Sequence, residues 1–444
     1  MIESEKKYSN KDYRRLGDRI RQNPHHIADD DLLMLQSLRL SYKEPLSTIF
    51  KSVEKTAHKV DNNCICTYRV KRIESIISKL LRFPEMQVNR AEDIAGCRCI
   101  MSSVEKVYEL YDRIMRNKDK LPFVIKGTIH DYIQHPKPSG YRSIHINAVL
   151  IDGDNRRIEI QLRALEHHNW ATLVEITDLL FDTKLKEHGK EASNDLFEFH
   201  RLLSIPDEEI KKKQKYFIAE TVIKYNYIET IGEVFARNYL DVRSRWNGLK
   251  LQRYPFFLVS TGSDGVPEFM GFMKFEEAES AYFNEFINND ENRNIVLTHL
   301  QEASFTKISI AYSNYFLTFN NAIINVLLYL SEAVVSAYRQ HRVGLFKRYY
   351  HCFLSLLTFW IQKQMLEQDS FKKDRIAMNS LRIKTEWTNS IKHGVDVLSQ
   401  ITVNMHKKLK FDPLHVAPYI AMKRKQQEFR ERYKEQQQQN ADRQ

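Results

Sequence analysis

PKPSGYRSIHI at 136–146 and IEIQLR at 158–163 are two short stretches in which polar and aliphatic residues alternate. Side chains of a strand switch faces at every residue, so we expect Ser143, His145 and Asn147 to share one face, with aliphatic side chains behind them. The second stretch alternates in the same way. Each stretch therefore predicts a strand with one buried face and one polar face.

A turn signal separates these two strands. The segment DGDN at 152–155 contains a glycine, which tolerates positive φ, so the strands are expected to pair antiparallel and to merge their polar faces. Glu159, Gln161 and Arg163 would then lie beside the polar residues of the first strand. An acid, bases and amides on one sheet face are the groups that a binding or catalytic site needs. An ordinary solvated sheet face, with no site, shows the same alternation of polar and apolar residues.

Length and charge set the outer limits. A chain of 444 residues exceeds the usual size of one core, so two or three domains are expected. The formal charge of +11 indicates anionic partners, among which nucleotides, RNA and acidic surfaces remain open. The charged start MIESEKKYSNKDYRR is unlike a signal peptide, and the apolar stretches near 321–338 and 352–360 are too short or interrupted to cross a bilayer. We therefore expect a cytoplasmic protein with no membrane segment.

The chain has an odd number of cysteines, five in all: Cys64, Cys66, Cys97, Cys99 and Cys352. An odd number in a long chain with a charged start is typical of a reducing compartment. The two C-x-C pairs are spaced more closely than the usual zinc motifs, and the second pair falls in an apolar stretch. We expect these thiols to serve packing rather than metal binding.

Hydrophobic periods predict an α+β fold with a mixed sheet flanked by helices. Helices are expected over 71–82, 104–117 and 164–180, and strands over 94–101, 123–134, 143–151 and 157–163. Strands at 256–260, 269–275 and 295–299, with a helix from Glu276, predict a small α/β unit, and the pattern from 320 to about 410 is helical. The expected divisions are 1–200, 201–320, 321–422 and a charged, Gln-rich tail at 423–444.

One face of the predicted helix at 71–82 is basic because four residues recur at helical spacing: Arg72, Ser75, Lys79 and Arg82. Arg69 and Lys71 precede this helix and add charge at one end, which suits a polyphosphate, although most basic helix faces are only solvated. Asp93, just before a strand, and Glu159 could come together to hold Mg²⁺ between phosphates, unless they are unrelated acids at strand edges.

Four segments resemble the synthetase domain of the RelA/SpoT alarmone synthetases, in the same order and with similar spacing. They are Arg69-Val70-Lys71 with Ser75 and Lys79, DIAGCRCI at 93–100, DYIQHPKPSGYRSIHI at 131–146 and IEIQLRALEHHNWATLVE at 158–175. The resemblance covers roughly residues 45–190 and implies a nucleotidyltransferase-like fold. It does not extend to the C-terminal half.

The resemblance implies transfer of the β,γ-pyrophosphate of ATP to the ribose 3′-hydroxyl of GDP or GTP, with Mg²⁺, giving (p)ppGpp and AMP. It assigns ATP binding to Arg69, Lys71, Ser75, Lys79 and Arg98, with the two arginines on the adenine. It assigns the metal to Asp93 and Glu159, with Glu159 alternatively taking the 3′-hydroxyl proton. The acceptor nucleotide would meet Lys137, Tyr141, Arg142, His145 and Gln161, with Tyr141 stacking on its base.

This sequence departs from the family pattern near the acceptor. Thr128 and His130 stand where the family usually has a charged pair, and Ser139 replaces a common asparagine. A second interpretation therefore keeps the chemistry and changes the acceptor to the 3′ CCA end of tRNA, as in toxic small synthetases. A third is an inactive nucleotide-binding module that works through protein contacts. The C-terminal half is left open between binding a regulatory protein, neutralising the synthetase, sensing a trigger and oligomerisation.

Overall fold

The computed structural model describes residues 8–24, 26–227, 230, 245–246, 253–261, 267–287, 295–300, 308, 320–374, 400–405 and 407–409. The chain forms two compact units, the first made of 1–173 and 237–318 and the second of 174–236 and 319–444. The expected tail at 423–444 lies outside the described residues.

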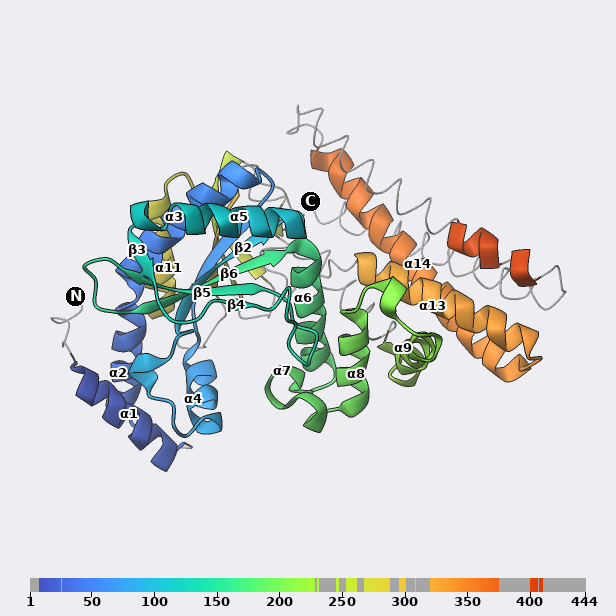
Figure 1. Ribbon diagram of the computed structural model, residues 1–444, viewed down its shortest axis with the longest axis horizontal. Helices are drawn as coiled ribbons and strands as arrows, with labels where there is room; N and C mark the ends of the chain where they lie inside the picture. The colour runs from blue at the N-terminus through green and yellow to red at the C-terminus, as the bar shows by residue number, and fades with distance from the viewer. Residues whose placement is uncertain are drawn as a thin grey trace, which may run out of the picture. The chain divides into compact units, whose positions relative to one another are not determined.

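The first unit is built on one mixed sheet. Its described strands are β1 (Ile65–Val70), β2 (Ala95–Met101), β3 (Phe123–Ile125), β4 (His130–Asp131), β5 (Ile144–Leu150), β6 (Arg157–Ala164), β7 (Phe256–Thr261), β8 (Pro267–Phe272) and β9 (Ile295–His299). Their order is β3-β5-β6-β2-β1-β9-β7-β8, with β4 paired to β5. Figure 1 labels the strands β2 to β6 of this sheet. β2 and β6 run parallel, and the other described pairs are antiparallel.

The expected hairpin of β5 and β6 is confirmed, since the two strands pair antiparallel across the 152–155 turn. The turn uses positive φ at Asp152 (61°) and Asn155 (55°) rather than at its glycine. The single strand expected at 123–134 is instead two short strands, separated by a bend at Gly127 with φ of 75°. The helix expected at 71–82 begins at Ile73.

The strands of the second half differ from the expectation of a separate small α/β unit. β9 pairs with β1, with Cys66 opposite His299, and β7 and β8 continue the same sheet. The edge of β1 that β2 leaves free is thereby covered, which removes an exposed row of backbone hydrogen-bonding groups. β9 lies more than two hundred residues from β1 in the sequence, and pairing over that separation leaves no local pattern. The strands themselves could therefore be predicted from the sequence, but the sheet that they join could not.

Helices cover one face of this sheet. The helices of the first unit are α1 (Asn10–Gln22), α2 (Asp29–Leu40), α3 (Lys43–Val60), α4 (Ile73–Arg82), α5 (Val104–Arg116) and α11 (Phe275–Ile287), with α6 (Leu165–Leu180) beginning in it. Figure 1 shows α3 and α5 lying across the strands. Rings from α3, β1 and α11 pack together, with centroids of Phe50 and Tyr68 5.0 Å apart and those of Tyr68 and Tyr282 5.3 Å apart. The apolar residues of β1 thus face α3 and α11, which leaves the alternate residues for the opposite face.

The second unit is helical, as expected for this part of the chain. Its described helices are α7 (Leu185–His188), α8 (Asn194–Leu203), α9 (Lys212–Lys224), α13 (Asn320–Arg339) and α14 (Val343–Asp374), with helical residues at 400–405 and 407–409. A tight turn with His341 at φ of 56° joins α13 to α14. Tyr349 on α14 donates a hydrogen bond to Glu220 on α9. None of the helices in the described part of the chain is long and apolar enough to span a membrane.

Candidate active site

The register of four strands gathers the predicted polar residues on the sheet face opposite α3. Glu159 on β6 pairs with Gly96 on β2 and with Asn147 on β5, and Gln161 pairs with Arg98 and His145. Paired residues point to the same side of a sheet, so these side chains share one face. His145 in turn pairs with His130 on β4. Ser143 departs from the expectation because it is buried and donates to the carbonyl of Leu162, 3.1 Å away.

Asp93 lies between two lysines at one end of this face. Lys71 Nζ and Lys79 Nζ each lie 2.7 Å from a different carboxylate oxygen of Asp93. Burial opposes ionisation of Asp93, but the two lysines outweigh it and lower the pKa of the carboxyl. Burial lowers the pKa of Lys71. The cluster is a carboxylate with two cations beside it: Asp93 at the turn before β2, Lys71 just before α4 and Lys79 in the last turn of α4.

Glu159 is held by its neighbours in an ionised state. Its Oε1 lies 2.7 Å from His145 Nδ1, and Gln161 Nε2 donates to its Oε2 over 2.6 Å. Burial raises the pKa of Glu159, and these two hydrogen bonds outweigh burial and lower it. Burial lowers the pKa of His145, which favours its neutral form. The tautomer that fits is therefore Nδ1–H donating to Glu159, with Nε2 free to accept.

A hydrogen-bonded chain continues from His145 through Tyr141. The Tyr141 hydroxyl lies 2.8 Å from His145 Nε2 and accepts from Arg163 Nη2 over 2.5 Å. Arg163 Nη2 also donates to Gln161 Oε1 over 3.1 Å, and Arg98 Nε donates to the same oxygen over 3.3 Å. This hydrogen-bonded chain links five of the site residues predicted from the sequence. It also includes Arg163, which the sequence placed on the same face but did not assign to the site.

An aromatic and cationic group borders this chain. Tyr132 was not predicted, and it stacks on His130 with centroids 5.4 Å apart and planes at 8°. Lys137 Nζ lies 4.5 Å from the centre of the Tyr132 ring and 5.3 Å from that of Tyr141. Burial lowers the pKa of Lys137. Tyrosine faces beside a cation are suited to a flat, anionic ligand such as a nucleotide.

The remaining predicted residues are less closely bound to this network. Arg69 is exposed at the end of β1, and the side chain of Ser75 makes no hydrogen bond to the part of the chain that the structure describes. Arg142 donates from Nη1 to the carbonyl of Ile133 over 3.0 Å, so its guanidinium braces the loop before the acceptor strand. Thr128 is exposed.

Two positioning residues were missed from sequence. Arg39 on α2 is buried and donates from Nε to the Lys71 carbonyl over 2.9 Å, and burial lowers its pKa to about 10. The Tyr282 hydroxyl on α11 accepts from the backbone N–H of Val70 over 2.8 Å. Both fix the backbone where β1 leads into the lysines that hold Asp93. Neither carries a local signal, because each lies far along the chain from the residue it holds.

Gly96 sets the spacing between β2 and β6 at Glu159. A Cβ placed on Gly96 would lie 2.6 Å from the carbonyl oxygen of Glu159 and 3.4 Å from its Cβ. The first distance is shorter than any ordinary contact, so a side chain at this position forces the strands apart. The close approach brings the turn that carries Asp93 next to Glu159.

Asp93 and Glu159 are the residues that could hold Mg²⁺. Carboxylate oxygens are the ligands that Mg²⁺ prefers, and the charge of Asp93 acts on Glu159 by raising its pKa. Two interacting, partly buried carboxylates are stabilised when a cation neutralises both, so the residues fit the ion.

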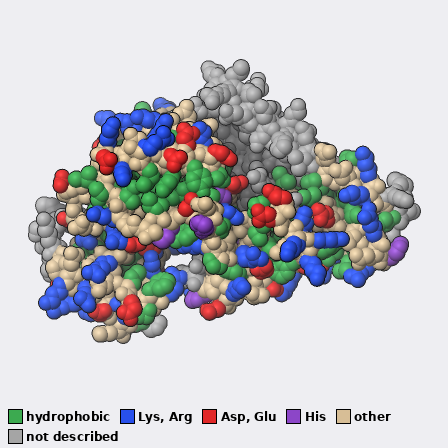
Figure 2. All heavy atoms as spheres, in the orientation of Figure 1, with side chains coloured by type: hydrophobic (Ala, Val, Ile, Leu, Met, Phe, Trp, Pro, Cys, Tyr) green, Lys and Arg blue, Asp and Glu red, His purple; other side chains and the backbone are tan. Residues whose placement is uncertain are grey.

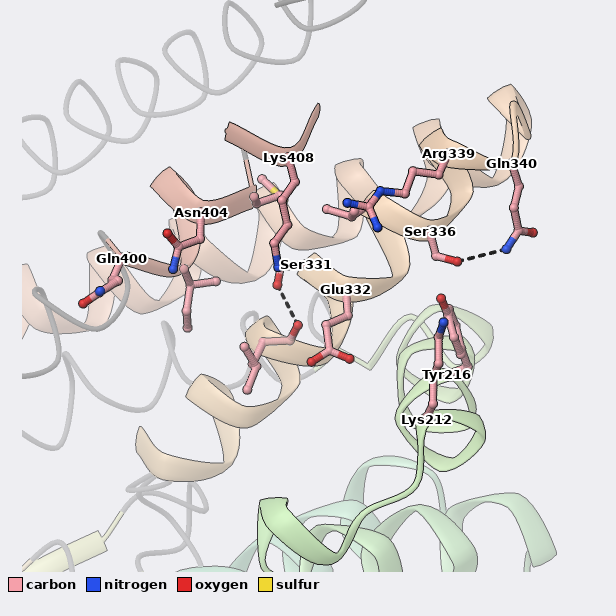
Figure 3. A pocket seen from close by; sticks show the side chains of 14 residues that line it. Lys212, Tyr216, Ser331, Glu332, Ser336, Arg339, Gln340, Gln400, Asn404 and Lys408 are labelled. Atoms are coloured by element: carbon pink, nitrogen blue, oxygen red, sulfur yellow. Dashed lines mark hydrogen bonds between the residues drawn. The ribbon is translucent and has the colours of Figure 1, made fainter. Parts of the chain in front are cut away.

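A separate pocket of about 560 Å³ lies within the second unit. Figure 3 shows Lys212 and Tyr216 reaching it from α9, Glu332 from α13 and Lys408 from the helical segment at 407–409. The Tyr216 hydroxyl is buried and has no hydrogen-bond partner in the described residues. This lining could accept a polar ligand, and it has no connection in sequence with the motifs of the first unit.

Comparison with known proteins gives matches to the same part of the chain. Residues 68–179 match the family described as the region found in RelA / SpoT proteins. GTP pyrophosphokinase YwaC of Bacillus subtilis (strain 168) is 36% identical over 116 residues, which are 24% of this chain and 53% of that protein. GTP pyrophosphokinase YjbM of the same strain is 30% identical over 131 residues, 28% of this chain and 60% of that protein.

A solved structure, small alarmone synthetase 2 from Bacillus subtilis, is 31% identical and matches 37% of this chain and 90% of its own, with a TM-score of 0.28. The chain spans between about half and two thirds of the length of the two curated relatives. The matched residues include both strands of the polar hairpin, the end of β1 and the turn that carries Asp93. Residues 68–179 are therefore a RelA/SpoT synthetase domain similar to small alarmone synthetases, and the rest of the chain is unassigned.

Proposed function

We propose that this domain moves the β,γ-pyrophosphate of ATP to the 3′-hydroxyl of GDP or GTP, giving ppGpp or pppGpp. One observation carries the proposal. Asp93 lies between Lys71 and Lys79 at the turn before β2, and the neighbouring strand β6 carries Glu159 with its hydrogen-bonded chain to His145 and Tyr141. It combines cations for a polyphosphate, two carboxylates for a divalent ion and an ionised base within one sheet face.

The donor would bind at the start of α4. Lys71 and Lys79 would leave part of their interaction with Asp93 for the phosphates, and Ser75 has a hydroxyl without a partner among the described residues. Arg72, the residue before α4, makes no side-chain cap, so the first N–H groups of a ten-residue helix remain available to an anion. Arg69 and Arg98 lie on neighbouring strands of the same face and would flank the adenine.

Glu159 would act on the acceptor hydroxyl. Its lowered pKa keeps it ionised at neutral pH, and His145 holds the carboxylate in one orientation through Oε1. In the transfer, the 3′-oxygen bonds to the β-phosphorus of ATP, the bond from that phosphorus to the α,β-bridging oxygen breaks, and AMP leaves. The hydroxyl proton passes to Glu159. Mg²⁺ held by Asp93 would neutralise charge on the transferred phosphates, with Glu159 as its second ligand in the alternative in which Glu159 does not take the proton.

The acceptor base would stack on Tyr141. Arg163 and His145 fix the hydroxyl of that ring, so its orientation is set before a ligand arrives. Lys137 lies over the two tyrosines and would meet the acceptor phosphates, while Gln161 bridges Glu159 to the arginines behind it. Arg142 would act by bracing the loop.

Transfer to the 3′ CCA end of tRNA is the second candidate, because the acceptor side offers little charge for free 5′-phosphates. Thr128 is uncharged and exposed, and His130 stacks on Tyr132. A nucleotide that continues into a chain at its 5′ side needs fewer cations there. On the face of the first unit seen in Figure 2, however, acidic side chains lie among the Lys and Arg side chains, so the described residues there do not form one continuous basic surface for RNA.

The test offers ATP with GDP, GTP or deacylated tRNA to the purified full-length protein in parallel. We expect AMP release with a guanosine product carrying a 3′-pyrophosphate. AMP release only in the presence of tRNA, with no guanosine product, would establish the second candidate instead. Absence of AMP with every acceptor would leave a nucleotide-binding module without this activity.

A further inference from the structure

A group of thiols and imidazoles lies on the helix-covered side of the sheet, away from the candidate active site. His58 near the end of α3 and Cys64 and Cys66 at the start of β1 offer three donor atoms that all lie within 4.8 Å of one another. The three residues are buried, with relative exposures of 7%, 2% and 0%. The C-x-C pair had been expected to serve packing alone.

The distances fit a tetrahedral metal centre. Cys64 Sγ lies 3.2 Å from His58 Nδ1 and 3.9 Å from Cys66 Sγ. With Zn–S near 2.3 Å and Zn–N near 2.0–2.1 Å, tetrahedral S···S and S···N edges are about 3.8 Å and about 3.5 Å. Cys99 Sγ on β2 lies 3.5 Å from Cys66 Sγ but is not one of the three donors that lie within 4.8 Å of one another, so the fourth ligand would be a water molecule.

The other side of the His58 ring is supported as a metal ligand would be. His58 Nε2 lies 3.1 Å from Glu54 Oε1, a close contact without the geometry of a hydrogen bond. The same oxygen of Glu54 is bound by His299 Nδ1 on β9. A carboxylate behind a histidine orients the ring and increases the basicity of the nitrogen that binds the metal.

We propose that His58, Cys64 and Cys66 bind a divalent cation of the zinc type, which would join α3 to β1. The site does not depend on the proposed transferase activity. It would tie the helix side of the sheet to the strand that leads to Lys71, with Glu54 and His299 extending the support to β9. A packing role explains why the two cysteines are buried. It does not explain why His58 Nδ1 lies against Cys64 Sγ, whereas metal binding explains both.

The first experiment measures metal content in the full-length protein purified without chelators or a histidine tag. Elemental analysis should find about one zinc ion per chain, and replacement by Co²⁺ should give thiolate charge-transfer absorption with the intense visible bands of tetrahedral coordination. Metal-free protein that shows no such bands when titrated with Co²⁺ would overturn the proposal, and this result needs no variant.

The second experiment compares variants. Cys64→Ser should lose most of the metal and the Co²⁺ charge-transfer band, whereas Cys97→Ala, a buried thiol of β2 outside the group, should keep both. Chelator treatment should lower the melting temperature of the wild type and leave that of Cys64→Ser unchanged. Equal metal content in Cys64→Ser and wild type would place the metal elsewhere and refute the assignment. If Cys64→Ser fails to fold, the wild-type Co²⁺ spectrum decides.

Discussion

Gly96→Ala should damage both the stability of the first unit and its activity. The added Cβ would lie 2.6 Å from the Glu159 carbonyl oxygen, whereas ordinary C···O contacts begin near 3.3 Å, so the strands must separate by about 0.7 Å. Overpacking of this kind costs about 1–3 kcal/mol. At about 2–4 °C per kcal/mol for a domain of this size, the melting temperature should fall by about 2–12 °C.

The activity should fall further than stability alone explains. Gly96 pairs with Glu159, so displacement of the strand moves the carboxylate relative to Asp93, and a misplacement of about 1 Å can cost about 10²-fold in rate. The assay measures AMP release at a temperature where the variant remains folded. The matched control is Gly17→Ala on α1, where an added Cβ meets nothing closer than 3.5 Å and should stabilise the helix by about 0.5–1 kcal/mol. Wild-type melting and turnover in Gly96→Ala would show that the close approach is not a constraint.

Three further outcomes are expected. Glu159→Gln should lower kcat by at least about 10²-fold with an unchanged circular dichroism spectrum, because it removes the charge that takes the proton, and near-normal turnover would exclude that role. Tyr141→Ala should raise KM for the guanosine acceptor with little effect on KM for ATP, and an equal loss for both would make the ring structural. Burial lowers the pKa of His200 in the second unit to about 3, so folding excludes a proton that the unfolded chain binds below about 6.5. Stability should therefore fall as pH drops from about 6.5 towards 3, and His200→Gln should show a smaller fall in urea unfolding between pH 7 and 4.5; equal slopes would contradict this.

The sequence by itself determined the local parts of the site. Alternation placed His145, Asn147, Glu159 and Gln161 on one face, because the side-chain period of a strand is two whatever surrounds it. The 152–155 segment specified the hairpin, and helical spacing put Lys79 on the polar side of α4. These features depend on neighbours within about twenty residues, which is the range over which backbone geometry imposes a pattern.

Only the tertiary structure decided which distant segments meet. The pairing of β9 with β1, the bond from Arg39 to the Lys71 carbonyl and the bond from His299 to Glu54 join residues through packing. In the sequence, Gly96 is only an interruption of an apolar strand. Its role in allowing the two strands to approach each other is seen only in the structure, where β6 lies beside β2. Burial of apolar surface has no preferred direction, so it favours compact arrangements in general. The local sequence of a strand or helix therefore does not specify which other element it will pack against.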